Sequence, residues 1–283
     1  MKILTSKSDL MSWRRRLSDL ETVVGFVPTM GALHEGHLSL VYQALEQNEV
    51  VVVSIFVNPT QFNNLDDLET YPRTLEADVT LLQTLSTDRI VVFAPSAHDL
   101  YDGTPKSKSW DFGPVSRVME GAFRTGHFDG VGTVLQLLFE AVNPMKSYFG
   151  EKDYQQLQIV KQLTAQLGQN NEIIGGSIYR EPSGLAMSSR NQRLTDVQKS
   201  QAPLIYRVLT FIKDHISSMS WSDLVLWAEE QFESDLGWRL EYLTLADAHS
   251  LESKDHYVET EPLRVFIAVH LGCVRLIDNL DLN

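Results

Sequence analysis

Four short apolar runs in the first two-thirds of the chain restrict its fold more than any other feature. They occupy residues 22–27, 50–57, 89–94 and 147–149. Apolar and polar residues do not alternate within them, which is typical of strands that helices cover on both faces. Segments with the apolar spacing of a helix face lie at 38–45, 75–85, 131–142 and 154–167. This alternation predicts an α/β fold: a doubly wound, Rossmann-like parallel sheet whose ligands bind beyond the carboxyl ends of the strands.

The pattern changes after about Gly176. Two helical segments and then two strand-like runs follow, at 195–216, 222–232, 240–246 and 265–271. Helices followed by a small sheet are typical of a separate α+β domain. We therefore predict a Rossmann-like domain over 1–176 and a smaller C-terminal α+β domain over 177–283 that covers the active site.

The net charge excludes several functions. The 283 residues include 24 Lys and Arg against 37 Asp and Glu, a formal charge of −13. Extended binding to nucleic acid or to an anionic membrane requires a basic face, so we expect neither. No apolar run approaches the roughly 20 residues that span a bilayer, and the N-terminal segment shows no secretory pattern. We expect a soluble protein of the cytoplasm.

The sequence has one cysteine, Cys273. It cannot form an internal disulfide, and it excludes multi-cysteine zinc and iron–sulfur sites. Such sparing use of cysteine is typical of a reducing compartment. Because Cys273 lies in an apolar run, we expect a buried, unreactive thiol.

The sharpest motif is the segment 28–37, PTMGALHEGH, which joins the first predicted strand to the first predicted helix. Gly31 and Gly36 permit a close backbone approach, and a helix N-terminus presents free amides to phosphates. His34 and His37 lie one helical turn apart and project from the same side. Two imidazoles beside amides suit a triphosphate whose α-phosphate gains negative charge during displacement. The alternatives are a metal pair or histidines that cap the helix; the spacing is one residue short of the zinc-protease motif.

Two further groups of polar residues follow predicted strands. Asn58 and Gln61 place amide groups at the end of the second strand; the alternative, favoured for this segment alone, is a turn that contains proline. After the fourth strand, Lys152 is suited to contact phosphate oxygens and Asp153 to accept the hydroxyl groups of ribose, with Gln156 one turn later. The alternative there is a solvated run of charges at the start of a helix.

The predicted domain junction carries another candidate. Ser188, Ser189 and Arg190 are suited to close over phosphates, with Gly184 as a hinge; the alternative is a capping turn. A glycine-rich segment, 120–127, is either a lid or an exposed loop.

Six blocks occur in order: VPTMGALHEGH (27–37), SIFVNPTQF (54–62), YPRT (71–74), GHF (126–128), FGEKD (149–153) and AMSSRN (186–191). Together they resemble the pantothenate synthetase (pantoate–β-alanine ligase) family, within the nucleotidyltransferase superfamily that has a His-x-Gly-His signature. The resemblance runs from the first strand to Arg193 and resumes at RLIDN, 275–279. The segment 186–190 is also similar to the mobile motif of class I tRNA synthetases.

The resemblance implies ATP-dependent condensation of (R)-pantoate with β-alanine through a pantoyl-adenylate, which releases AMP and pyrophosphate and requires Mg²⁺. The product, pantothenate, belongs to coenzyme A biosynthesis. The resemblance also implies a homodimer whose other partners are these small molecules. Activation of a carboxylate by ATP needs no enzyme nucleophile, in agreement with the lack of an obvious Ser-His-Asp or Cys-His pattern. Two alternatives stay open: a related nucleotidyltransferase that acts on a phosphorylated acceptor, and a nucleotide-binding module without catalysis.

The resemblance assigns the site residues as well. Those that would act in catalysis are His34, His37, Lys152 and Arg190, with His37 as proton donor. Gln61 and Gln156 would bind pantoate and β-alanine. The residues that would contact ATP are Met30, Gly31, Ala32, Leu33, His34, Glu35, Gly36, His37, Gly150, Glu151, Lys152, Asp153, Tyr179 (through its backbone), Met187, Ser188, Ser189 and Arg190. Metal ligands are not assigned, because Mg²⁺ keeps several waters and is held largely by substrate phosphates. Residues 181–183 and Asp129 depart from the family pattern.

Overall fold

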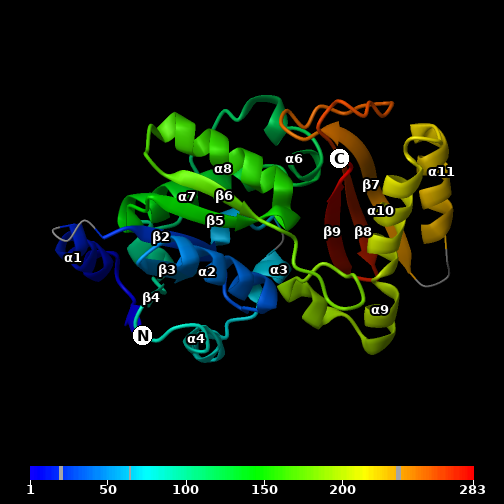
Figure 1. Cartoon of the computed structure of the whole chain (residues 1–283). Helices are drawn as coiled ribbons and strands as arrows, with labels where there is room; N and C mark the ends of the chain where they lie inside the picture. Colours follow the sequence, from blue (N-terminus) through cyan, green and yellow to red (C-terminus); the bar gives the residue numbers. More distant parts are fainter. Residues whose placement is uncertain (19–21, 64, 234–236) are drawn as a thin grey trace. The chain divides into compact units, whose positions relative to one another are not determined.

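The computed structural model describes residues 1–18, 22–63, 65–233 and 237–283. The chain, drawn in Figure 1, divides into two compact units. The first unit is Met1–Glu151 with Gln156–Ser177, and the second is Ile178–Asn283 with Lys152–Gln155. The long segment of the second unit thus starts at Ile178, against the residue 177 that the sequence pattern predicts. The functions given to the two domains stay predictions.

The first unit is built on a six-stranded parallel sheet. The apolar runs predict its parallel arrangement and four of its strands, whereas the two edge strands are not predicted. In spatial order its strands are β1 (Lys2–Leu4), β4 (Ile90–Phe93), β3 (Val50–Ile55), β2 (Val24–Thr29), β5 (Lys146–Gly150) and β6 (Glu172–Gly176). Each neighbouring pair runs parallel. From β2 the chain proceeds to β3 and β4 on one side, and later to β5 and β6 on the other. The order reverses between β2 and β5, and open parallel sheets bind ligands beyond the strand ends at such a switch point.

Helices pack on both faces of this sheet. Val27 lies in an apolar core with Val41 of α2. Phe26, on the opposite face, meets Phe139 of α7 edge to face, with 6.2 Å between ring centroids. Both faces are buried, which explains why polar residues do not alternate along the strands. The helices from α1 to α8 are α1 (Lys7–Ser18), α2 (Glu35–Gln47), α3 (Leu65–Glu69), α4 (Leu75–Gln83), α5 (Ala97–Leu100), α6 (Glu120–Phe123), α7 (His127–Val142) and α8 (Tyr154–Leu167), with 3₁₀ turns η1 (Pro59–Gln61), η2 (Gly113–Ser116) and η3 (Glu151–Asp153).

The second unit combines a three-stranded antiparallel sheet with helices. The sequence predicts this α+β character and two of the three strands. Its strands are β7 (Trp238–Asp247), β8 (Leu263–Leu271) and β9 (Val274–Asp281), in that spatial order. Its helices are α9 (Asp196–Gln201), α10 (Leu204–His215) and α11 (Trp221–Phe232), with the 3₁₀ turn η4 (Ser189–Arg193). Leu209 and Ile212 of α10 share an apolar core with Val265 and Val269 of β8. No helix within the described ranges is both long and apolar enough to cross a lipid bilayer.

Two expectations for this unit are wrong. The sequence predicts one helix over 195–216, but Pro203 separates α9 from α10, because proline lacks the amide hydrogen that a helix interior needs. The sequence also predicts a buried Cys273, but this residue is exposed. It follows Gly272, whose φ is +60°, in the turn between β8 and β9. The apolar run around it belongs to two strands, and the cysteine lies between them.

Candidate functional site

A buried carboxylate holds the turn between β2 and α2. Asp78 of α4 is 3% exposed and accepts hydrogen bonds from the backbone amides of Ala32 (3.1 Å) and Leu33 (2.8 Å). Thr74 donates its hydroxyl to the same carboxylate at 3.2 Å. Gly31 and Ala32 have left-handed backbone conformations, with φ of +83° and +50°, which persist only where the surroundings impose them. Sequence reasoning missed Asp78, since no local pattern links it to a turn 45 positions earlier.

His34 and His37 begin α2 in a reciprocal capping arrangement. His34 Nδ1 accepts from the amide of Gly36 at 3.2 Å, and His37 Nδ1 accepts from the amide of His34 at 3.3 Å. Because a neutral imidazole carries one N–H, each ring then has its hydrogen on Nε2, a tautomer assigned from these contacts. The ring centroids lie 4.1 Å apart. The two rings thus lie close together after the carboxyl end of β2. The capping interpretation is confirmed, and it uses the Nδ1 atom of each ring.

The backbone amides of this turn are not free, contrary to the expectation from sequence. Those of Ala32 and Leu33 donate to Asp78, and that of Gly36 donates to an imidazole. The physical reason is that a buried turn must provide partners for its N–H groups. An anion that binds here would therefore meet the two imidazoles rather than these amides.

Gln61 lies beside the start of the same turn. Asn58 Nδ2 donates to Gln61 Oε1 at 3.1 Å, and Gln61 Nε2 lies 3.1 Å from Met30 Sδ. Asn58 is 1% exposed, and it is held by the hydroxyl of Tyr101 (2.6 Å) and the carbonyl of Gly130 (3.2 Å). The segment is thus more than a proline turn, because it fixes an amide side chain where β3 ends, next to β2.

The start of α7 packs against this pair of amides. The glycine-rich segment expected as a lid or an exposed loop ends in His127, which is buried and whose Nδ1 lies 2.9 Å from the carbonyl oxygen of Gln61. A Cβ at Gly130 would lie 2.3 Å from a backbone oxygen of η1, so glycine is required for this close approach. Asp129, which departs from the family pattern, accepts the amide of Trp110 at 2.9 Å. These contacts support Gln61 from α7.

The remaining candidates of the first unit follow β5. Gly150 ends β5, Glu151 begins η3, and Gln156 lies in the first turn of α8, partly buried. Since β5 is the neighbour of β2, the residues that follow β2, β3 and β5 lie along one edge of the sheet. That edge includes the switch point of the strand order.

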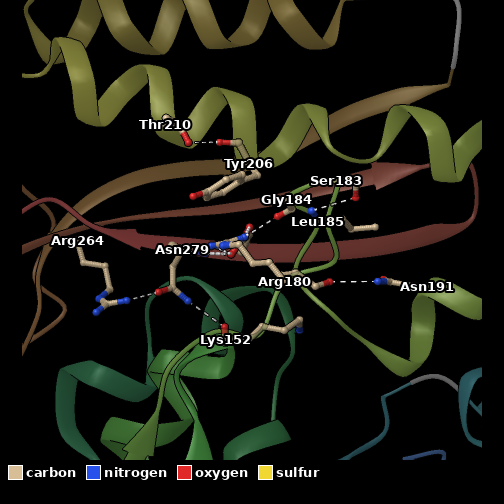
Figure 2. Close-up of polar contacts among 12 residues, drawn as sticks. Lys152, Arg180, Ser183, Gly184, Leu185, Asn191, Tyr206, Thr210, Arg264 and Asn279 are labelled. Atoms are coloured by element: carbon tan, nitrogen blue, oxygen red, sulfur yellow. Dashed lines mark hydrogen bonds and ion pairs between the residues drawn. The ribbon is translucent and has the colours of Figure 1, made fainter. Parts of the chain in front are cut away.

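Lys152 belongs to the second unit. Its side chain is 18% exposed, and its Nζ lies 3.8 Å from Asp153 Oδ1. Its carbonyl oxygen accepts a hydrogen bond of 3.0 Å from Asn279 Nδ2 of β9, drawn in Figure 2. The long ion pair with a half-exposed carboxylate fixes Lys152 only weakly. The contact with β9 fixes its backbone.

A small hairpin precedes the serine pair of the second unit. Arg180 and Ala186 form an antiparallel bridge, and the amide of Gly184 donates to the carbonyl of Glu181 at 2.8 Å. The segment that departs from the family pattern is therefore a tight turn. Gly184 has a φ of +92°, and a Cβ there would lie 2.4 Å from the ring of Tyr206. Only glycine fits this packed turn, and movement about it stays a prediction.

The predicted ATP-contacting residues of this unit flank the hairpin, with Tyr179 before it and 187–190 after it. The amide of Met187 donates to the carbonyl of Tyr179 at 2.9 Å. Ser188 Oγ accepts from the amide of Arg190 at 3.3 Å and so caps η4, as the alternative interpretation has it. Ser189 is buried. The structure brings these five residues together in one short stretch.

The residues present do not fit a magnesium site held by protein alone. Across the part of the chain that the structure describes, no three His, Cys, Asp or Glu side chains are grouped so as to hold a metal ion. Mg²⁺ demands near-octahedral oxygen ligands, and the two imidazoles direct Nδ1 at backbone amides.

Comparison with known proteins agrees with the resemblance seen in the sequence. The family model described as pantoate-beta-alanine ligase matches residues 2–281. The chain is 44% identical to the pantothenate synthetase of Flavobacterium psychrophilum and 45% identical to that of Christiangramia forsetii, over 100% of both chains in each case. The solved pantothenate synthetase of Thermus thermophilus matches with a TM-score of 0.90 at 38% identity, over 100% of this chain and 99% of that one.

A second solved relative carries ligands. The pantoate-beta-alanine ligase of Francisella tularensis, complexed with beta-gamma ATP and beta-alanine, matches with a TM-score of 0.82 at 38% identity, over 100% of this chain and 98% of that one. Sequence, family model and fold thus agree over the whole length. The chain belongs to the pantoate–β-alanine ligase family.

Proposed function

We propose that this chain joins pantoate to β-alanine with ATP, through a pantoyl-adenylate, and so forms pantothenate, AMP and pyrophosphate. The observation that carries the proposal is the reciprocally capped pair of His34 and His37, whose ring centroids lie 4.1 Å apart, with the amide of Gln61 beside the same turn. Family membership supports the substrates, and the Francisella tularensis relative is complexed with beta-gamma ATP and beta-alanine.

The reaction has two displacements. In the first, a carboxylate oxygen of pantoate forms a bond to the α-phosphorus of ATP, and the bond to the bridging oxygen breaks, so that pyrophosphate leaves. In the second, the β-alanine nitrogen attacks the acyl carbon of the mixed anhydride, AMP leaves with the bond electrons, and the nitrogen loses its proton. Because no enzyme nucleophile takes part, catalysis consists of positioning and of stabilising the charge that develops on phosphate oxygens.

Four side chains are proposed to act on the phosphates. His34 and His37 would donate Nε2–H hydrogen bonds to oxygens that gain charge. Since His37 has its one hydrogen on Nε2, it would stabilise the departing pyrophosphate by that hydrogen bond and would not transfer the proton. Lys152 would act as a point charge, and the planar fork of Arg190 would bind two oxygens at once.

The other assignments divide between the two substrates. Gln61 and Gln156 would hold the hydroxyl and carboxylate groups of pantoate, because an amide both donates and accepts. The proposed contacts to the rest of ATP are Met30, Gly31, Ala32, Leu33, Glu35, Gly36, Gly150, Glu151, Asp153, Tyr179, Met187, Ser188 and Ser189. Mg²⁺ would arrive bound to the phosphates of ATP, where it would neutralise part of their charge. A homodimer in the cytoplasm is proposed on the family resemblance alone.

Isotope exchange separates the proposed chemistry from its alternatives. With ATP, Mg²⁺ and pantoate but no β-alanine, we expect labelled pyrophosphate to exchange into ATP, because formation of the adenylate is reversible. With β-alanine added, AMP and pantothenate should accumulate in equal amounts. A stable nucleotide product with a phosphorylated acceptor, or exchange that does not need pantoate, would contradict the proposal.

Substitution of the proposed phosphate contacts tests the assignment of residues. We expect His37→Ala and Lys152→Ala each to lower kcat/KM for the exchange about 10²–10³-fold, as removal of a group that stabilises developing charge does elsewhere. The exposed His249 offers a matched control, and His249→Ala should retain the wild-type rate. Unchanged exchange in either test variant would remove that residue from the site.

A further inference from the structure

Two neighbouring polar residues, Asp278 and Asn279, lie buried within β9. Successive residues of a strand point to opposite faces of a sheet. Asp278 pairs in register with Ile267, which belongs to the core beneath α10. Asn279 pairs with Phe266, whose ring meets that of Tyr154 at 5.9 Å. Buried polar groups are costly unless they have partners, and the partners of these two are informative.

On the α10 side, Asp278 holds the hairpin that precedes the serine pair. Its carboxylate accepts two hydrogen bonds from the guanidinium of Arg180, at 2.6 and 3.0 Å. The same guanidinium donates to the carbonyl of Gly184 at 3.1 Å and lies 4.0 Å from the ring centroid of Tyr206. Figure 2 shows the Arg180 side chain running between the hairpin and β9. The hairpin is thus tied to β9, and Ser188, the N-cap of η4, follows two residues after the hairpin closes at Ala186.

On the other side, Asn279 holds the backbone of Lys152. Its Nδ2 donates to the carbonyl oxygen of Lys152 at 3.0 Å, and its Oδ1 accepts from Arg264 Nη1 at 2.5 Å (Figure 2). Arg264 in turn stacks over the ring of Tyr154, 4.0 Å from its centroid. The start of α8 and Lys152, two residues before it, are therefore fixed to the same strand.

We infer that Asp278 and Asn279 are positioning residues, which hold Lys152 and the loop 188–190 at a set spacing for the phosphates of ATP. The inference rests on the proposed function, in which Lys152 and Arg190 contact these phosphates. Anchoring two separate loops to consecutive residues of one strand removes freedom between them, and charge is stabilised best by groups that are already in place. A buried ion pair adds little net stability compared with apolar residues. A role in positioning the two loops therefore explains Asp278 and Asn279 better than a role in stabilising the fold does.

Asn279 provides the sharper test, because one atom contacts Lys152. Asn279→Ala removes the donor, and Asn279→Asp removes it while keeping the size of the side chain and an acceptor for Arg264. We expect each to raise KM for ATP about 10-fold, the effect of one hydrogen bond, and to change KM for pantoate less than about 2-fold. Asp281→Asn removes a different partner of Arg264, at 3.1 Å, and should leave both KM values unchanged. A merely structural role would lower the active fraction and leave KM for ATP as it is, which would overturn the inference.

A combined variant asks whether Asn279 acts through Lys152. In a Lys152→Ala background, adding Asn279→Ala should raise KM for ATP by less than about 2-fold more, because the ammonium that it positions is already absent. Independent, multiplying effects would overturn the inference. If Lys152→Ala itself leaves ATP kinetics unchanged, the proposed function of Lys152 fails and the inference fails with it. If Lys152→Ala is impaired and Asn279→Ala is not, the inference alone fails.

Discussion

The turn after β2 and the loops around Lys152 and Arg190 are held in place in opposite ways. In the turn, both imidazoles are fixed by amides no more than three residues away. Lys152 and the hairpin before Arg190 are fixed by β9, through contacts that span 127 and 98 residues. A local arrangement leaves a recognisable motif, whereas a distant anchor leaves isolated polar residues in a strand. Substitutions far along the chain should therefore matter most for the second region.

Removing Arg180 should have the largest effect on stability. Asp278 is buried, and Arg180 donates two hydrogen bonds to its carboxylate. Arg180→Met leaves this carboxylate without its cation, and we expect the free energy of unfolding at pH 7 to fall by about 3–5 kcal/mol. Urea unfolding measures the loss. The double variant Arg180→Met/Asp278→Asn should recover much of it, since it leaves no buried charge.

This loss should depend on pH in a defined direction. Burial raises the pKa of Asp278 above its ordinary 3.8, and the hydrogen bonds from Arg180 oppose that rise. Without Arg180 the folded state keeps the proton to higher pH than the unfolded chain does. The free energy of unfolding therefore falls as pH rises from about 3.8 through the folded pKa. The deficit of Arg180→Met should be smaller at pH 5 than at pH 7, and a deficit independent of pH would contradict this account.

The same contrast explains how far the fold follows from the sequence. Unbroken apolar runs predict the four inner strands of the parallel sheet because these strands are buried on both faces, whereas the edge strands β1 and β6 are more exposed and are not predicted. The apolar spacing of 154–167 predicts α8 with its observed bounds. Nothing predicts β9, because Arg275, Asp278 and Asn279 interrupt its apolar pattern. These interruptions are the side chains whose partners lie elsewhere in the second unit. The spacing of apolar residues indicates which side chains are buried against apolar neighbours. It does not indicate buried polar side chains that are held by hydrogen bonds to distant residues.

The candidate site follows the same rule. His34, His37 and Gln61 can be placed from the sequence because each follows a predicted strand, and parallel strands end at one edge. Asp78 cannot be placed, because its partners are backbone amides, which every residue possesses. The expectation of free amides in the turn is wrong for the same reason. The sequence contains the carboxylate of Asp78 but does not indicate which backbone amides donate hydrogen bonds to it.

Asp78 is distant in sequence from the turn after β2, yet it accepts hydrogen bonds from two of its amides. Substitution of Asp78 tests whether the local contacts of this turn are enough to hold it. Asp78→Ala removes the acceptor of two buried amides, and we expect a loss of about 2–3 kcal/mol in the free energy of unfolding. Asp78→Asn keeps one acceptor oxygen and should lose less. Thr80→Ala, on an exposed position of α4, is the control for both. Wild-type stability and ATP affinity in Asp78→Ala would show that the capping contacts of the two histidines hold the turn unaided.

Substitution of Glu241 should have the smallest effect on the free energy of unfolding. It tests whether a polar contact that stabilises the second sheet also affects the residues proposed to bind ATP. Glu241 joins the three strands of the second sheet, since it accepts from Arg275 at 2.8 Å and lies 3.0 Å from His270 Nε2. Burial tends to raise the pKa of Glu241, but the hydrogen bonds from Arg275 and His270 outweigh it and lower the pKa below 4.5. The stabilisation is therefore present above pH 4.5 and lost as pH falls through the lowered folded value.

Glu241→Gln should accordingly cost at most about 1 kcal/mol at pH 7, and less in acid. Its partners have no assigned role towards ATP, so KM for ATP should stay at the wild-type value, in contrast to Asn279→Ala. Thermal unfolding at several pH values and ATP kinetics measure the two quantities separately. If KM for ATP rises in Glu241→Gln as well, any disturbance of this sheet reaches the ATP-binding residues. The polar pair of β9 would then have no special position, and the distinction between local and distant anchors would apply to stability alone.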